Sequence, residues 1–262
     1  MPFMPDRRQM LAALPALILA GRPALAQDDA PVVAAASDLH FAVEEIAAAF
    51  RAETGQEVRL SFGSTGNFAR QIREGAPFQI FMAADESFIA DLYRDGFTRD
   101  TGDLYALGRI VVKVPEGSLL VPDGTLASLR AALAEGRITR FAIANPDHAP
   151  YGMRAREALQ HAGLWEDIQP FLVLGENVSQ AAQFALSGNA EGGIIALSLA
   201  LAPEVAARGS HGLIPEDYHQ PLRQRMALMK GAGPVAEAFY AYLQSPSARA
   251  ILERYGFVLP EA

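Results

Sequence analysis

The sequence predicts an α/β protein with largely parallel strands. Short apolar runs that have the pattern of strands alternate along the chain with amphipathic segments that have the pattern of helices, and this alternation is typical of that class. The chain has 262 residues, half of them hydrophobic, which is enough for one large domain or for two lobes of about 100 to 150 residues. We find no internal repeat and no low-complexity linker, so any two lobes are expected to be joined by strands or short loops.

Residues 1–26 predict an export signal rather than a part of the fold. Arg7 and Arg8 precede an apolar run at residues 10–20, and Ala24-Leu25-Ala26 forms a small-residue cleavage site. A buried N-terminal helix is the alternative, which Pro15 and Pro23 disfavour. The paired arginines leave both Sec and Tat export open. Since no other apolar stretch is long enough to span a bilayer, we expect a soluble protein in the periplasm. Cleavage changes the net charge from −8 to −10, because the segment carries three Arg and one Asp.

The expected elements follow from the apolar pattern, taken in chain order. Strands are expected at residues 32–36, 58–62, 78–83, 109–114, 140–144 and 193–197. Helices are expected at residues 38–54, 67–74, 152–162, 179–187 and 234–243, the last continuing into 247–255. In the first helix Leu39, Val43, Ile46 and Phe50 fall on one face, and Gly55 follows as a natural C-terminal stop.

Composition excludes several classes of function. The 30 acidic residues outnumber the 22 basic ones, which include only two lysines, and this argues against a nucleic-acid binder. With no cysteine, the chain has no disulfide, thiol nucleophile, iron–sulfur cluster or Cys-ligated zinc. The five histidines show no metal-ligand spacing, and the Gly63-Ser64-Thr65-Gly66 turn lacks the pattern of a P-loop or of a nucleophile elbow. No enzyme is therefore predicted, and no cofactor.

Four strand-to-helix junctions carry small or hydroxylic residues where a helix begins. They are Ala36-Ser37-Asp38, Gly63-Ser64-Thr65-Gly66, Pro150-Tyr151-Gly152 and Asn177-Val178-Ser179. Such junctions lie at the carboxyl ends of strands, where α/β proteins bind ligands, and the free N–H groups of each first turn can hold an anion without a cationic side chain. Ordinary N-capping by Ser37, Ser64 and Ser179 is the alternative explanation, and it stays open at this point.

At these junctions the sequence resembles the periplasmic molybdate-binding proteins of ABC importers, over nearly the whole chain that follows the export signal. The recognisable pieces are Ala34-Ala35-Ala36-Ser37, Ser61-Phe62-Gly63-Ser64-Thr65-Gly66, Ala69-Arg70-Gln71-Ile72, Gly75-Ala76-Pro77, Ala83-Ala84-Asp85, Asn145-Pro146-Asp147-His148, Pro150-Tyr151-Gly152, Glu176-Asn177-Val178 and Tyr255-Gly256-Phe257. The resemblance implies a type II-like, two-lobed binding protein, each lobe a small mixed sheet flanked by helices, with the ligand in the cleft. It implies residues 27–108 plus 214–262 for lobe 1 and residues 109–213 for lobe 2.

By the same resemblance, the ligand is molybdate, and tungstate with it, captured as a whole oxyanion without direct metal ligands. Ser37 with Ser64 or Thr65 would supply donors from lobe 1, and backbone N–H groups near Tyr151 and Val178 would supply them from lobe 2. Some family members place a ligand-contacting tyrosine where this chain has Ala196. We expect a hydroxyl of Tyr151 or Ser198 in its place, with Ala36 and Gly152 as further candidates. The resemblance implies a membrane permease as the partner. Capture of the ligand by closure of the two lobes needs only one copy of the chain, so we expect a monomer.

Three alternatives remain from the sequence. The first is a binding protein for another small anion such as sulfate, phosphate, a phosphonate or an organic acid, which the departure at Ala196 motivates. Asp38 and Glu176 could accept the proton of hydrogen phosphate, although an acid in a first helical turn also favours the helix dipole without any ligand. The second is an exported serine hydrolase using Ser37 or Ser64, for which the sequence offers no base. The third is a ligand-sensing protein that signals to a membrane receptor.

Overall fold

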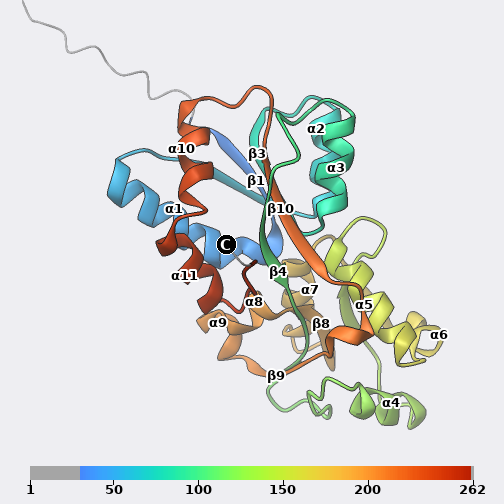
Figure 1. Ribbon diagram of the computed structural model, residues 1–262. Coiled ribbons are helices and arrows are strands. Elements are labelled where there is room, and N and C mark those ends of the chain that lie inside the picture. The colour runs from blue at the N-terminus through green and yellow to red at the C-terminus, as the bar shows by residue number, and fades with distance from the viewer. Residues whose placement is uncertain (1–29, 261–262) are drawn as a thin grey trace, which may run out of the picture.

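The computed structural model describes residues 30–260. These residues form two lobes, each built around a five-stranded sheet with helices on its faces (Figure 1). The two-lobed α/β prediction is confirmed. The expected export signal at residues 1–26 lies outside the described residues. Among the helices of residues 30–260, none combines the length and the apolar character that crossing a membrane requires.

The first lobe contains the sheet with strand order β2-β1-β3-β10-β4. Its strands are β1 (Val32–Ala36), β2 (Arg59–Gly63), β3 (Phe78–Ala83), β4 (Asp103–Gly108) and β10 (Leu222–Leu228). Its helices are α1 (His40–Thr54), α2 (Thr65–Arg73), α3 (Glu86–Arg94), α10 (Pro234–Tyr242) and α11 (Pro246–Arg254), with a 3-10 turn η1 (Ser37–Leu39) before α1. Gly55 ends α1 in the left-handed conformation, with φ of 71°, as its sequence position predicted.

Alternating residues of the first sheet pack against helices on opposite faces. Ala34, Phe81 and Ala83 face α2 and α3, in a cluster with Phe68 and Ile89 from those helices. The residues between them on β1 and β3 face α1, α10 and α11 instead, and these helices lie on the other side of the sheet in Figure 1. Since both faces are covered, the strands are almost continuously apolar, which is why the sequence pattern revealed β1 and β3.

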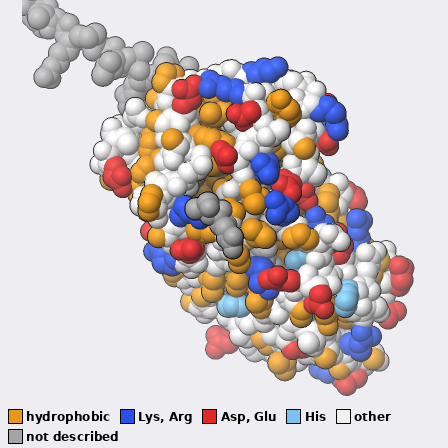
Figure 2. Space-filling model, in the orientation of Figure 1, with side chains coloured by type: hydrophobic (Ala, Val, Ile, Leu, Met, Phe, Trp, Pro, Cys, Tyr) orange, Lys and Arg blue, Asp and Glu red, His pale blue; other side chains and the backbone are white. Residues whose placement is uncertain are grey.

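The second lobe contains the sheet with strand order β7-β6-β8-β5-β9. Its strands are β5 (Ile110–Pro115), β6 (Phe141–Ala144), β7 (Leu172–Gly175), β8 (Gly192–Ala196) and β9 (Gly209–Leu213). Its helices are α4 (Ala127–Ala134), α5 (Pro150–His161), α6 (Trp165–Ile168), α7 (Val178–Ala185), α8 (Leu197–Leu201) and α9 (Pro203–Ala206), with a 3-10 turn η2 (Gln169–Phe171), and a further 3-10 turn, η3 (Glu216–Tyr218), lies between β9 and β10. On the face drawn in Figure 2, acidic and basic side chains are interspersed over both lobes.

The chain passes between the two sheets twice. β4 of the first sheet ends at Gly108 and β5 of the second begins at Ile110, and the chain returns from β9 to β10 through η3. The C-terminal segment lies beside the first crossing, where Leu107 and Val258 exchange backbone hydrogen bonds of 2.7 and 3.1 Å. Both crossings are short, so they can act as a hinge between two rigid bodies.

Each sheet is mixed, as the resemblance implied, because four of its five strands run in one direction and one strand runs against them. β1 is parallel to β2 and β3, and β6 is parallel to β7 and β8, but β10 and β5 are antiparallel to both of their neighbours. The reason is the double crossing, because β5 and β10 are the first strands of the chain after each passage and run against the sheet they join. The six expected strands are displaced by no more than one residue at either end from β1, β2, β3, β5, β6 and β8.

Candidate functional site

Four helical segments begin at one small cavity between the lobes. From the first lobe come η1, which follows β1, and α2, which follows β2; from the second come α5, which follows β6, and α7, which follows β7. The cavity has a volume of about 10 Å³. It is lined by Ala36, Ser37, Asp38, Gly63, Ser64, Thr65, Ala84, Ala149, Pro150, Tyr151 and Val178, and is called the small cavity below. The four junctions nominated from the sequence are thus neighbours in space.

Most of the expected site residues lie on this wall, and three do not. Ala36, Ser37, Ser64, Thr65, Tyr151 and Val178 line the small cavity. Gly152, Ala196 and Ser198 are not among its lining residues. Gly152 packs instead on the carbonyl of Ala144 in β6, which a Cβ at this position would approach to 2.2 Å. Ala196 is wholly buried, and the Ser198 hydroxyl donates to the carbonyl of Asp38 at 2.8 Å.

The three lining hydroxyl groups are held by neighbouring donors. Ser37 Oγ accepts from the Ser179 backbone N–H at 3.3 Å, and Thr65 Oγ1 accepts from the Ala84 N–H at 3.0 Å. Ser64 caps α2, with its Oγ 3.4 Å from the Asn67 nitrogen, and also lies 2.9 Å from His148 Nδ1. A hydroxyl that accepts from a backbone N–H keeps its own proton for another acceptor. Ser37 and Thr65 can therefore each donate into the cavity.

Ser37 and Ser179 differ from the simple N-caps that the sequence also allowed. The cap of α7 is Asn177, whose side chain accepts from the Gln180 N–H at 3.0 Å, and no side-chain cap is present at η1. Ser179 uses its hydroxyl to donate to the Ser37 carbonyl at 2.8 Å, across the lobes. Of the three serines, only Ser64 follows the N-cap alternative.

The electrostatics of the small cavity come from backbone groups. The first-turn N–H groups of α2, α5 and α7 have no acceptor inside their own helices, and each helix start carries a partial positive charge. The residues that line the cavity include no Lys and no Arg. An anion placed here would be held by neutral donors at close range.

Asp38 stands in the wall of the cavity within a buried network. Its Oδ2 accepts from the Tyr151 hydroxyl at 2.9 Å and from Gln224 Nε2 at 2.6 Å, while Tyr105 donates to Gln224 Oε1 at 2.7 Å. Burial raises the pKa of Asp38 to about 6. Burial also raises the pKa of the Tyr151 and Tyr105 hydroxyls well above the usual range of a tyrosine. The Tyr151 hydroxyl, expected as a replacement donor for the ligand, is thus engaged by Asp38.

Several contacts hold the lobes against each other around the small cavity. The Gly66 N–H donates to the His148 carbonyl at 2.9 Å, and a Cβ on Gly66 would lie 2.5 Å from that oxygen. Arg154 on α5 pairs with Asp85, the cap of α3, at 2.6 Å, with both side chains largely buried. The Asn67 amide also donates to the carboxylate of Glu176. The lobes are therefore closed over the site.

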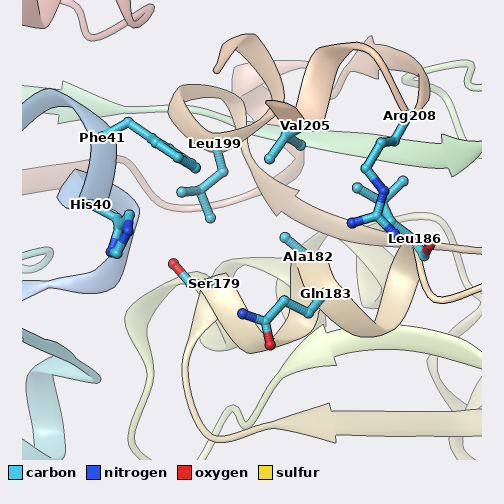
Figure 3. A pocket seen from close by; sticks show the side chains of 9 residues that line it. All are labelled: His40, Phe41, Ser179, Ala182, Gln183, Leu186, Leu199, Val205 and Arg208. Carbon is cyan, nitrogen blue, oxygen red and sulfur yellow. Dashed lines mark hydrogen bonds between the residues drawn. The ribbon is translucent and has the colours of Figure 1, made fainter. Parts of the chain in front are cut away.

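A second and larger cavity also lies between the lobes. Its volume is about 120 Å³, and it is called the large cavity below. It is lined by His40, Phe41, Ser179, Ala182, Gln183, Leu186, Leu199, Val205 and Arg208 (Figure 3). Apolar side chains dominate this lining, and the Arg208 guanidinium already donates to the Leu186 carbonyl at 2.6 Å. More space is present here than in the small cavity, and the lining is more apolar.

Comparison with known proteins agrees with this architecture. A model for the family of bacterial extracellular solute-binding proteins matches residues 31–258. The chain belongs to this family. Within residues 30–260, this solute-binding protein has no group of three or more His, Asp and Glu side chains that could hold a metal ion.

The relatives of this solute-binding protein include molybdate-binding proteins. It is 36% identical to the molybdate-binding protein ModA of Azotobacter vinelandii over 95% of this chain and 98% of the relative. It is 34% identical to the ModA of Rhodobacter capsulatus over 87% of each chain. The solved periplasmic molybdate-binding protein of Azotobacter vinelandii superposes with a TM-score of 0.78 at 31% identity, covering 88% of this chain and all of that one. The resemblance expected from the junction motifs is confirmed, and family and relatives are solute-binding proteins rather than enzymes.

Proposed function

We propose that this protein captures molybdate and tungstate in the periplasm and delivers them to the permease of an ABC importer. One observation carries the proposal: helix starts from both lobes meet at one small cavity between the lobes, which offers hydroxyl and backbone donors and has no cationic side chain in its lining. That donor set suits a small, fully deprotonated oxyanion. Among such oxyanions, the similarity to molybdate-binding proteins favours molybdate.

The proposed ligand contacts divide between the lobes. Ser37 and Thr65 donate their hydroxyl protons, and Ser64 joins them from the start of α2. The second lobe contributes the backbone N–H groups of Tyr151 and Val178. Tyr151 acts through its backbone, because its hydroxyl is bound to Asp38. Neither Ala196 nor Ser198 is included, so no side-chain hydroxyl replaces the tyrosine that some family members carry.

Binding is proposed to proceed by a hinge motion. Lobe 1 comprises residues 27–108 plus 214–262 and lobe 2 comprises residues 109–213, which agrees with the two points where the chain changes sheets. The small cavity has room for about one water-sized group, so a tetrahedral oxyanion enters only when the lobes part. A monomer is sufficient for this motion. Export by a signal at residues 1–26 places the protein where the permease can be reached.

The exported-hydrolase alternative gains a base that the sequence did not offer, because His148 lies beside Ser64 and its Nε2 is 3.8 Å from a carboxylate oxygen of Glu176. One feature opposes catalysis. Glu176, the carboxylate beside His148, is largely exposed, so it does not hold the imidazole in a fixed, buried orientation as the acid of a catalytic triad does. Purified protein is expected to show no turnover of generic ester substrates, and turnover abolished by Ser64→Ala would support the hydrolase.

Isothermal titration of the protein without its first 26 residues tests the proposed function. Molybdate and tungstate are expected to bind with micromolar or lower Kd, and sulfate and hydrogen phosphate weakly. Rigid donors spaced for the larger anions stand too far from the oxygens of sulfate and hydrogen phosphate, and the acceptor in the cavity wall that could take the phosphate proton is the carboxylate of Asp38. Tight binding of sulfate, a phosphonate or an organic acid without binding of molybdate would reject this choice of ligand.

A further inference from the structure

The carboxyl group of Asp38 has one oxygen for which the structure provides no partner. The residue is 1% exposed, and its Oδ2 is fixed by Tyr151 and Gln224. Its Oδ1 is buried and makes no hydrogen bond, although the residue lines the small cavity. Unpartnered polar atoms are rare in protein interiors and call for an explanation. A ligand in the cavity is the natural partner for this atom.

The groups around Asp38 carry no positive charge that would offset an ionised carboxylate. The Tyr151 hydroxyl on α5 and the Gln224 amide on β10 donate to its carboxyl group, the Ser198 hydroxyl on α8 donates to its backbone carbonyl, and Tyr105 on β4 lies behind Gln224. All four are uncharged. A dianion held beside an ionised Asp38 would meet a like charge in a site shielded from water, which is unfavourable. Either the anion is rejected or the carboxylate loses its charge.

We propose that Asp38 takes up one proton when the oxyanion binds, and that the resulting Oδ1–H donates a hydrogen bond to the anion. The inference rests on the proposed function and concerns the same site. One proton moves from solvent to Oδ1, and no other bond forms or breaks. Oδ1 is the oxygen that receives it because both contacts of Oδ2 come from donors. The binding of a dianion then adds one negative charge to the site instead of two.

The titration of Asp38 agrees with this geometry. Burial raises the pKa of Asp38 to about 6 even though the hydrogen bonds from Gln224 and Tyr151 lower it, and a dianion beside the carboxyl group raises this pKa further. His148 also contacts a hydroxyl of the cavity, because its Nδ1 lies 2.9 Å from Ser64 Oγ. The two residues differ in chemistry, since one is a carboxyl group and the other an imidazole, so an experiment can separate them.

The first measurement is isothermal titration with molybdate in buffers of different ionisation enthalpy, over a pH range in which the anion itself does not titrate. About one proton is expected to be taken up per anion near pH 8, and Kd is expected to rise by up to about tenfold per pH unit above pH 6. Hydrogen phosphate brings its own proton to Oδ1, so any binding of that anion is expected without uptake. This contrast identifies the proton with the oxygen that faces the ligand.

Variants assign the proton to a residue. Asp38→Asn keeps an oxygen for Tyr151 and Gln224 and places an N–H donor at the position of Oδ1. We expect this variant to show no proton uptake and to bind molybdate about tenfold or more tighter than wild type near pH 8. Glu176→Gln makes the same chemical change at an exposed carboxyl near the same cavity, and it should keep the uptake. His148→Asn should keep it as well.

An infrared difference spectrum gives a readout that does not depend on a variant folding. Addition of molybdate to wild type is expected to produce the C=O band of a protonated carboxyl group, and Asp38→Asn is expected to lack it. Binding with neither proton uptake nor this band overturns the inference and leaves the proposed function standing. Uptake that is lost in His148→Asn but kept in Asp38→Asn assigns the proton to histidine and also overturns it. Absence of molybdate and tungstate binding overturns the proposed function itself.

Discussion

The two cavities between the lobes differ in volume and in the groups that line them, and the cavity with the smaller volume is the one where helices begin. The large cavity offers about 120 Å³, and apolar side chains dominate its lining. The small cavity offers about 10 Å³, yet the starts of four helical segments surround it. An anion needs unpaired donors at short range more than it needs room, because leaving water costs it strong hydrogen bonds. The smaller cavity is therefore the better anion site.

The largest expected effect comes from preventing the lobes from closing over the small cavity. Gly66→Ala places a Cβ 2.5 Å from the His148 carbonyl of the other lobe, so the lobes must stay apart. We expect a loss of molybdate affinity of about 100-fold, since donors displaced by about an ångström no longer act together. Calorimetry measures the loss, and small-angle scattering with ligand reports the opening. Gly231→Ala is the matched control, because no atom lies within 4 Å of its added Cβ.

A smaller loss is expected from removing one donor of the small cavity. Ser37→Ala deletes a hydroxyl expected to donate to a charged ligand, which is worth about 1.5–3 kcal/mol, or roughly 10- to 100-fold in Kd. The melting temperature should fall only slightly, because the Ser179 N–H that loses its acceptor is partly exposed and its hydrogen bond to Ser37 Oγ is long, at 3.3 Å. Thr65→Ala should lower stability as well, since it leaves the buried Ala84 N–H without its acceptor. A fall in melting temperature with unchanged affinity in Ser37→Ala would indicate a purely structural serine.

The third prediction concerns the stability of the protein without ligand. Because burial raises the pKa of Asp38 from 3.8 to about 6, the folded state favours the protonated form. Wild-type stability therefore falls as pH rises between these two values and stays reduced above them, by about 3 kcal/mol. Asp38→Asn removes this dependence, so its advantage in melting temperature should grow from pH 4 to pH 7. An equal difference at both pH values would contradict a raised pKa.

The smallest effect on molybdate affinity is expected from a substitution in the large cavity. Arg208→Gln removes the cationic side chain from its lining while keeping an amide that can donate to Leu186. Molybdate affinity should stay within about twofold of wild type, because the ligand is not bound there. A loss comparable to that of Ser37→Ala would place the anion in the large cavity and reverse the assignment.

Of the ten strands in the part of the chain that the structure describes, the sequence predicted six and missed β4, β7, β9 and β10. β1 and β3 are buried on both faces and show clear apolar runs. β10 was not predicted, since Arg223 and Arg225 interrupt its pattern, and the structure shows both arginines paired with Glu86. β9, with the sequence Gly-Ser-His-Gly-Leu, has almost no apolar signal. Such strands are fixed by long-range pairing, which local pattern does not encode.

The candidate site divides in the same way. The junctions at Ser37 and Thr65 were predicted, because helix starts have a local signature. From the sequence, Asp38 was considered only as a possible acceptor beside its junction. The hydrogen-bond network around its carboxyl group was not predicted, because Gln224 reaches Asp38 from β10 and Tyr105 reaches Gln224 from β4. The polar residue Gln224, alternating with buried Leu222 and Met226, was the available signal in the sequence. The spatial neighbours of Asp38 could not be read from its own segment.

The bonds that close the lobes have a consequence for how long the ligand stays. Arg154 with Asp85, and Ser179 with Ser37, join protein atoms only, so they stabilise the closed form equally for every anion that fits. The rate of escape is then governed largely by these bridges, while the ratio of affinities between anions is governed by donor spacing. Residence time and selectivity can therefore be changed independently: weakening a bridge shortens the stay of every bound anion by one common factor and leaves the preference between anions intact.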